Sequence, residues 1–218
     1  MAAAPPPGTA AGYRAVFAVR EFRPVVGSVV VTLLGDVVAH IALSLLVYRT
    51  TGSPALTALT FALGFLPYAI GGTLLSSVAD RFPARRVLVG CDLVSACCAA
   101  AMALPGVPVA ALLALRCVMA TAAPVFSGAR AASLTEILDG DRYVLGRSVI
   151  RIIAQSAQIV GYGIGGLVLV VLPPRACLVL TAAGFLVSAA MLRFGTRLRP
   201  ARAAGGDALL RQSLRYGE

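Results

Sequence analysis

Hydrophobic residues follow one another in six long runs, and polar residues collect in the stretches between the runs. Each run is close to the roughly 20 residues that a helix needs to cross the hydrocarbon core of a bilayer. The pattern therefore predicts an all-α membrane protein with six transmembrane helices. The expected segments are residues 25–48, 55–79, 87–104, 107–126, 149–172 and 176–194.

The polar stretches divide the chain into three parts. We expect residues 1–24 to form a tail followed by an amphipathic lead-in on the membrane surface. Residues 25–194 are expected to form the helical bundle, and residues 195–218 a polar cytoplasmic connector. The longest loop within the bundle is expected at residues 130–147, where Asp139-Gly140-Asp141-Arg142 has the composition of a turn.

Arginine placement predicts the orientation in the membrane. All 19 basic residues are arginines. With the N-terminus in the cytoplasm, 16 of them fall on the cytoplasmic side, whereas only Arg49 and Arg175 fall outside and Arg116 lies in mid-membrane. Because cytoplasmic loops carry an excess of arginine and lysine, we expect both termini to be cytoplasmic in a multi-pass protein of the plasma (inner) membrane.

The composition excludes several other classes of protein. The chain is 59% hydrophobic and 13% charged, whereas soluble domains are nearer half apolar and a quarter charged. The net charge of +10 is explained by topology, so we expect no nucleic-acid partner. The single histidine and five cysteines lack the spacing of a metal site, and neither H-E-x-x-H nor G-x-S-x-G occurs. We therefore expect no metal, no cofactor and no enzyme activity.

The polar stretch between the second and third runs resembles the loop between helices 2 and 3 of the major facilitator superfamily. The family pattern is G-x-x-x-D-R-x-G-R-R or close to it. Ser76 stands where the first glycine is usual, and Pro83 stands where the second is usual. The residues assigned to this cytoplasmic-loop motif are Ser76, Asp80, Arg81, Arg85 and Arg86.

The resemblance implies a fold as well as a motif. It covers the N-terminal half of the family's twelve-helix fold, in which six helices form two inverted three-helix repeats. We therefore expect the partners to be membrane lipid and either a missing C-terminal six-helix half or a second chain. Ala157, Gly161, Tyr162, Gly165 and Gly166 resemble the antiporter pattern of the fifth helix, which favours efflux over import.

Candidate chemistry lies in the first and fourth runs. Thr32, Asp36 and His40 follow one another at four-residue spacing and so share a helix face. Asp36 is near the centre of its run, where an ionised acid costs about 2.5–3.5 kcal/mol, so it should face a cavity or a partner. Arg116 lies at similar depth and resembles the arginine of the family's fourth-helix L-x-x-R pattern, with Leu113 as the leucine.

Two interpretations of these residues stay open. Asp36 and Arg116 form either a structural pair or a proton-coupling pair, with His40 as a partner of Asp36. We expect Asp92 to lie near the membrane interface and to pair with Arg85 or Arg86, which leaves Asp36 as the only acid deep in a segment.

A second polar row lies on the fifth run, where Arg151, Gln155, Gln158 and Tyr162 share a face that lines a cavity or joins helices. The predicted function is secondary transport, namely proton-coupled efflux of small molecules as in the drug, macrolide and siderophore efflux branch. The alternatives are a six-helix membrane scaffold or binding protein without transport activity, and an inactive truncated fragment.

Overall fold

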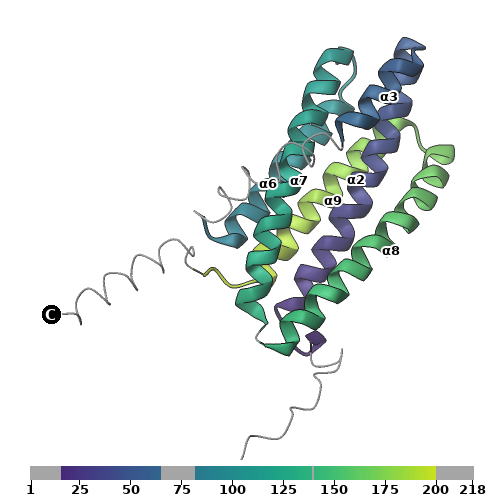
Figure 1. The fold of residues 1–218 in the computed structure, drawn as a ribbon. Helices are drawn as coiled ribbons and strands as arrows, with labels where there is room; N and C mark the ends of the chain where they lie inside the picture. Colours follow the sequence, from purple (N-terminus) through teal and green to yellow (C-terminus); the bar gives the residue numbers. More distant parts are fainter. Residues whose placement is uncertain (1–15, 65–81, 139, 200–218) are drawn as a thin grey trace, which may run out of the picture.

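The structure is a computed structural model that describes residues 16–64, 82–138 and 140–199 (Figure 1). The described residues form six helices and no strand, so the all-α fold is confirmed. The loop-motif residues Ser76, Asp80 and Arg81 lie outside the described residues, as do 1–15 and 200–218. The helices are α2 (Phe22–Thr51), α3 (Pro54–Leu63), α6 (Ala84–Ala103), α7 (Val109–Ile137), α8 (Asp141–Val171) and α9 (Pro174–Gly195).

Five of these helices, all except α3, are long and apolar enough to cross a membrane. The short helix α3 begins with a serine cap, in which the hydroxyl of Ser53 accepts a long hydrogen bond from the backbone N–H of Leu56 at 3.4 Å. Pro54 occupies the first helical position, where its missing N–H leaves no bond unmade. The remainder of the predicted second segment, residues 65–79, lies outside the described residues.

The long loop predicted at residues 130–147 is wrong. Helix α7 continues to Ile137 and α8 begins at Asp141, so the connection is only a few residues long. Gly140 has a φ of 54°, a conformation that residues with a Cβ rarely adopt, and it lets the chain reverse. Because α7 has 29 residues and α8 has 31, both exceed the roughly 20 residues of a span, and they are long enough for their charged ends to continue beyond the hydrocarbon.

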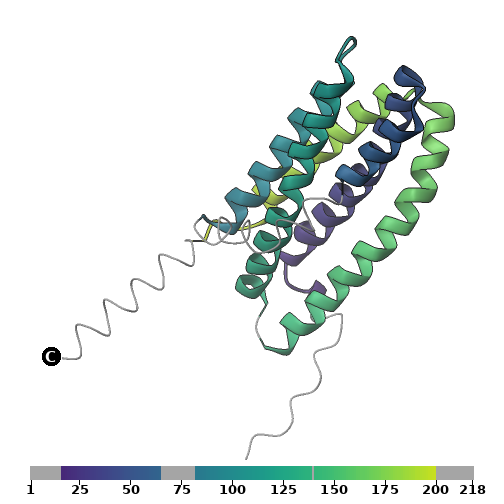
Figure 2. The same ribbon diagram turned by 45° about the horizontal axis from the view of Figure 1, so that its top comes forward.

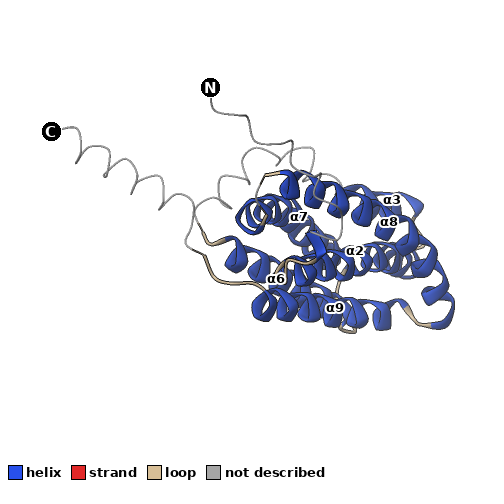
Figure 3. Ribbon diagram, turned by 90° about the horizontal axis from the view of Figure 1, so that it is seen from below, coloured by secondary structure: helices blue, strands red, loops and turns tan. Residues whose placement is uncertain are grey.

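The first three described helices (α2, α3 and α6) and the last three (α7, α8 and α9) pack against one another. Helix α2 packs against α8 and α9, while α7 packs against α3 and α6. Seen from below in Figure 3, α6 and α9 lie on one side, α3, α7 and α8 on the other, and α2 between them. In each set of three, the first helix thus packs against helices of the other set, as in two inverted three-helix repeats.

Most of the described arginines gather at one end of the bundle, where α2, α6 and α8 begin and α7 and α9 end (Figure 1). Glu21 joins the two ends of the described chain there, because its carboxylate pairs with Arg199 at 2.9 Å and with Arg197 at 3.5 Å. Arg49 and Arg175 lie at the opposite end, on the last turn of α2 and the first turn of α9.

Candidate functional site

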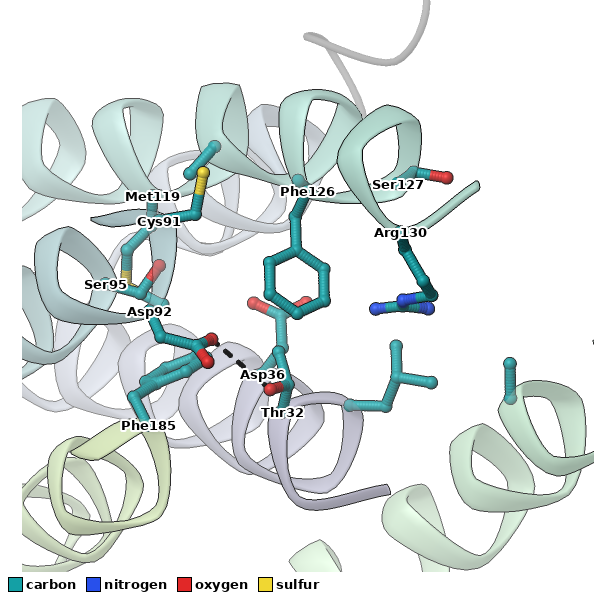
Figure 4. Close-up of a pocket in the computed structure, with 14 residues that line it drawn as sticks. Thr32, Asp36, Cys91, Asp92, Ser95, Met119, Phe126, Ser127, Arg130 and Phe185 are labelled. Atoms are coloured by element: carbon teal, nitrogen blue, oxygen red, sulfur yellow. Dashed lines mark hydrogen bonds between the residues drawn. The ribbon is translucent and has the colours of Figure 1, made fainter. Parts of the chain in front are cut away.

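A cavity of about 230 Å³ opens between α2, α6, α7, α8 and α9 (Figure 4). Its wall combines large apolar side chains with two carboxylates and a guanidinium. Figure 4 shows the side chains of Asp36, Phe126 and Arg130 pointing into the same space from α2 and α7. The polar lining residues are Thr32, Asp36, Asp92, Ser95, Ser127 and Arg130, and the large apolar ones are Leu33, Met119, Phe126 and Phe185.

Asp36 on α2 and Arg116 on α7 form an ion pair with 3.0 Å between Oδ1 and the guanidinium NH1. The two partners differ sharply in exposure, since 43% of the Asp36 side chain but only 2% of the Arg116 side chain is accessible. Asp36 lines the cavity, whereas Arg116 is held in the protein behind it. A proton or a ligand in the cavity can therefore reach the Asp36 carboxylate but not the Arg116 guanidinium.

His40 binds the guanidinium nitrogen of Arg116 that does not contact Asp36. The second guanidinium nitrogen of Arg116 donates to Nδ1 of His40 at 3.2 Å, because a guanidinium can only donate. Nδ1 is then the acceptor, so Nε2 carries the hydrogen and donates to the carbonyl of Phe61 on α3 at 3.1 Å. The sequence predicted Asp36 as the partner of His40, but these ring hydrogen bonds go to Arg116 and Phe61, and they link α2, α3 and α7.

The residue that follows α3 must be small for this cluster to exist. A Cβ on Gly64 would lie 2.6 Å from the NH2 nitrogen of Arg116 and 2.7 Å from Cε1 of His40. Both distances are shorter than the contacts that a Cβ atom makes with atoms to which it is not bonded. Both neighbouring side chains are held in place by hydrogen bonds. Gly64 therefore leaves the space in which Arg116 and His40 meet.

The prediction that Asp92 pairs with Arg85 or Arg86 near the interface is wrong. Asp92 is only 1% exposed, and its carboxylate accepts hydrogen bonds from Ser188 at 2.6 Å and from Thr32 at 3.4 Å. The two hydroxyls are themselves 2.9 Å apart. Asp92 thus joins α6 to α2 and α9, and it is a second acid on the cavity wall, so Asp36 is not the only deep one.

A signal in the sequence could have placed Asp92 correctly. The buried residues of α6 recur at helical spacing, and Asp92 belongs to this stripe rather than to the arginine end. No local pattern could have identified its partner Ser188, which lies 96 residues away. The stripe consists of Ala84, Leu88, Asp92, Ser95, Ala99 and Met102.

Removing the Asp92 carboxyl should weaken the bundle. We expect Asp92→Ala to lower the free energy of unfolding by about 1–3 kcal/mol, because two hydrogen bonds to a buried group are lost. Asp92→Asn should cost less, since an amide can still bond to Ser188 and Thr32. Thermal unfolding in detergent measures both changes, and equal stability of Asp92→Ala and the native chain would contradict the assigned role.

The candidate residues of the fifth run all lie on α8, where some are buried against α2 and others are exposed. Gly161 and Gly165 are buried against α2, where Cβ atoms would lie 3.3 Å from Leu34 and Val37 and 2.9 Å from Ile41, respectively. Gly166 faces open space. The polar row of Arg151, Gln155, Gln158 and Tyr162 is exposed in this chain.

Part of the polar row of α8 lies on the same side of the helix as one residue of the cavity wall. Ala154 lines the cavity, and residues three before and four after it, Arg151 and Gln158, share its side of the helix. Arg130 was missed by the sequence interpretation because it fell in the predicted loop. Its guanidinium carbon lies 4.6 Å from the ring centre of Phe126, so a cation–π contact positions it at the cavity mouth.

Comparisons with known proteins identify the family. The family model described as Major Facilitator Superfamily matches residues 25–215. Two similar relatives are both named Macrolide efflux protein A, one from Streptococcus pyogenes and one from Streptococcus pyogenes serotype M6. Each is 30% identical over 66 residues, which is 30% of this chain and 16% of the relative. The aligned stretch therefore spans well under two thirds of the relatives' length.

Proposed function

The chain belongs to the Major Facilitator Superfamily, and on this premise we propose that it forms the N-terminal six-helix half of a proton-coupled exporter of small molecules. The observation that carries the proposal is the unequal exposure of the Asp36–Arg116 pair. Asp36 faces the cavity, and Arg116 is buried behind it.

This asymmetry suits a coupling site. Arginine stays protonated in proteins, so the charge of Arg116 is fixed, whereas a carboxyl can be neutral or charged. A proton that enters the cavity neutralises Asp36 and breaks its charge pairing with Arg116. When the proton leaves, the pair forms again, so the protonation of Asp36 can bias the conformation around the cavity.

Transport requires a second six-helix unit, because alternating access arises from two halves that rock about a site near the midplane. Helix α8 offers a surface for it. Polar side chains are costly against lipid, so the exposed row of Arg151, Gln155, Gln158 and Tyr162 needs a protein or aqueous neighbour. We propose that this row faces the second unit across the transport path.

We propose a substrate class from the residues of the cavity wall and from the relatives' name. Met119, Phe126 and Phe185 offer apolar contact beside the two carboxylates. The relatives' name refers to macrolides, so a macrolide such as erythromycin is the first probe. A cavity of about 230 Å³ encloses only part of such a molecule, and we propose that the second unit supplies the remaining contacts.

The test is uphill transport by the chain completed with a second six-helix half. The complete protein is reconstituted in liposomes, and radiolabelled erythromycin is followed under an imposed pH gradient. The proposal predicts accumulation against the erythromycin gradient and its loss when a protonophore collapses the pH gradient. Accumulation that survives the protonophore would contradict proton coupling, and its absence for erythromycin and other drugs alike would favour a scaffold.

Orientation gives a separate prediction. We propose that the arginine-rich end is cytoplasmic in the plasma membrane, since cytoplasmic segments carry the excess of arginine. Single cysteines are introduced as Phe82→Cys at that end and Thr51→Cys at the other, both exposed, in a chain whose five native cysteines are replaced. An impermeant maleimide applied outside whole cells should label Thr51→Cys alone. Labelling of Phe82→Cys without permeabilisation would contradict the orientation.

A further inference from the structure

A groove separate from the cavity lies between the first turns of α6 and the end of α9. Figure 2 shows these two segments side by side at one end of the bundle. The volume of the groove is about 370 Å³. Three arginines surround it at one end and apolar residues continue it along α6. They are Arg85, Arg86 and Arg193, followed by Val89, Gly90 and Leu93.

The arginines of this groove have no acidic partner among the described residues. Arg85 donates instead to the backbone carbonyl of Arg193, which ties the start of α6 to the end of α9. The neighbouring Arg197 and Arg199 differ, because both pair with Glu21. Because the three arginines line one groove, their positive charges repel one another, and an anion between them would relieve that repulsion.

The groove changes from charged to apolar along the axis of α6. Arg85, Val89 and Leu93 follow at four-residue spacing and share a face, and Arg86 stands one turn before Gly90. From Arg86 to Leu93 the helix rises by about 10 Å, at 1.5 Å per residue. Leu93 is 43% exposed, and a Cβ on Gly90 would meet nothing within 4 Å, so the apolar part of the groove is open.

At Gly90 the groove faces away from the transport cavity. Gly90 and Asp92 are two residues apart, which places them about 200° apart around the helix. Asp92 points into the bundle, so Gly90 points outward, toward the lipid that surrounds a membrane-spanning helix. The groove therefore has positive charge at the membrane surface and an apolar part that extends inward. A phospholipid matches both parts, because it joins a phosphate and an acyl chain in one molecule.

We propose that this groove binds an anionic phospholipid, with its phosphate between Arg86 and Arg193 and one acyl chain along Val89, Gly90 and Leu93. Guanidinium groups suit this role because they bind phosphate oxygens with paired hydrogen bonds. The site goes beyond the transport function and does not depend on it. A free phosphate shares the charge of the lipid headgroup but has no chain to occupy the apolar part.

The test is lipid retention by the purified full chain in native mass spectrometry. The chain is equilibrated with equal amounts of phosphatidylglycerol and phosphatidylcholine that carry identical acyl chains. We expect phosphatidylglycerol to be retained at least tenfold over phosphatidylcholine, and this preference to disappear in the double variant Arg86→Gln/Arg193→Gln. The matched control is Arg147→Gln, an exposed arginine at the same end on α8, which should retain the preference.

A second variant tests the acyl-chain part. Gly90→Leu fills the open groove without meeting another protein atom at its Cβ, and leucine favours the helix more than glycine does. It should reduce phosphatidylglycerol retention severalfold without lowering the thermal unfolding temperature of the lipid-free chain. Equal retention of the two lipids by the native chain would overturn the proposal. So would full displacement of phosphatidylglycerol by inorganic phosphate combined with no effect of Gly90→Leu, since that result identifies a site for a soluble anion.

Discussion

Asp36→Asn is expected to reduce proton-driven efflux to the background level in a transporter completed with its second half. The amide keeps the size of the acid and one acceptor oxygen for Arg116, but it carries no negative charge and does not take up or release a proton, so the Arg116 charge is never alternately paired and released. Exchange of labelled for unlabelled substrate at equal pH should persist, because it needs no net movement of protons. Both rates are measured in the same proteoliposomes.

Two companion variants separate coupling from general damage. Asp36→Glu retains a titratable group and should retain part of the efflux. Asp92→Asn removes an acid from the same cavity wall, but one whose oxygens are already held by Ser188 and Thr32, so uphill efflux should survive. Native uphill efflux by Asp36→Asn would show that Asp36 is structural or that coupling resides in the second half.

Arg116→Ala is expected to damage both the fold and transport. Its side chain is fully enclosed, bonds to Asp36 and His40, and joins α7 to α2. Truncation leaves a cavity and two unpaired groups, so we expect the free energy of unfolding to fall by about 2–4 kcal/mol. Thermal unfolding in detergent measures the fold, and equilibrium binding of erythromycin by the completed transporter measures the site.

Gly64→Ala tests the same cluster without removing any of its groups. The added methyl would push Arg116 and His40 apart, so the variant should weaken coupling and stability in the direction of Arg116→Ala. Gly163→Ala on α8 adds the same methyl where nothing lies within 4 Å, and it should behave as the native chain. Native stability and efflux in both Arg116→Ala and Gly64→Ala would show that the cluster has no such role.

The fold could be predicted from the sequence because each spanning helix carries its own signal. Hydrophobic length places a helix in a membrane whatever surrounds it, and five of the expected segments are long apolar helices in the structure. Charged residues misled the prediction at helix ends. Arg130 and Arg147 were placed in a loop, yet they lie on α7 and α8, because a helix can continue into water once its apolar span is complete.

The candidate site could be predicted only in part, since its contacts join distant residues. Asp36 and Arg116 stood out because a charge in mid-membrane is costly and requires a partner or a cavity. Asp92 is also a buried charge, but its short distance from the start of the segment led to the prediction that it lies near the interface. Its place on the buried stripe of α6 indicates the bundle interior instead. Gly64 carried no signal, because its importance depends on side chains of two other helices that meet beside it.

Proton release on substrate binding tests the central claim most directly. The completed transporter is held in weakly buffered detergent solution at each of a series of pH values, and erythromycin is added while a pH indicator is followed. If Asp36 is the coupling group, the native protein releases about one proton for each erythromycin bound, and Asp36→Asn binds erythromycin without release. Equal proton release by the native protein and Asp36→Asn would contradict the account.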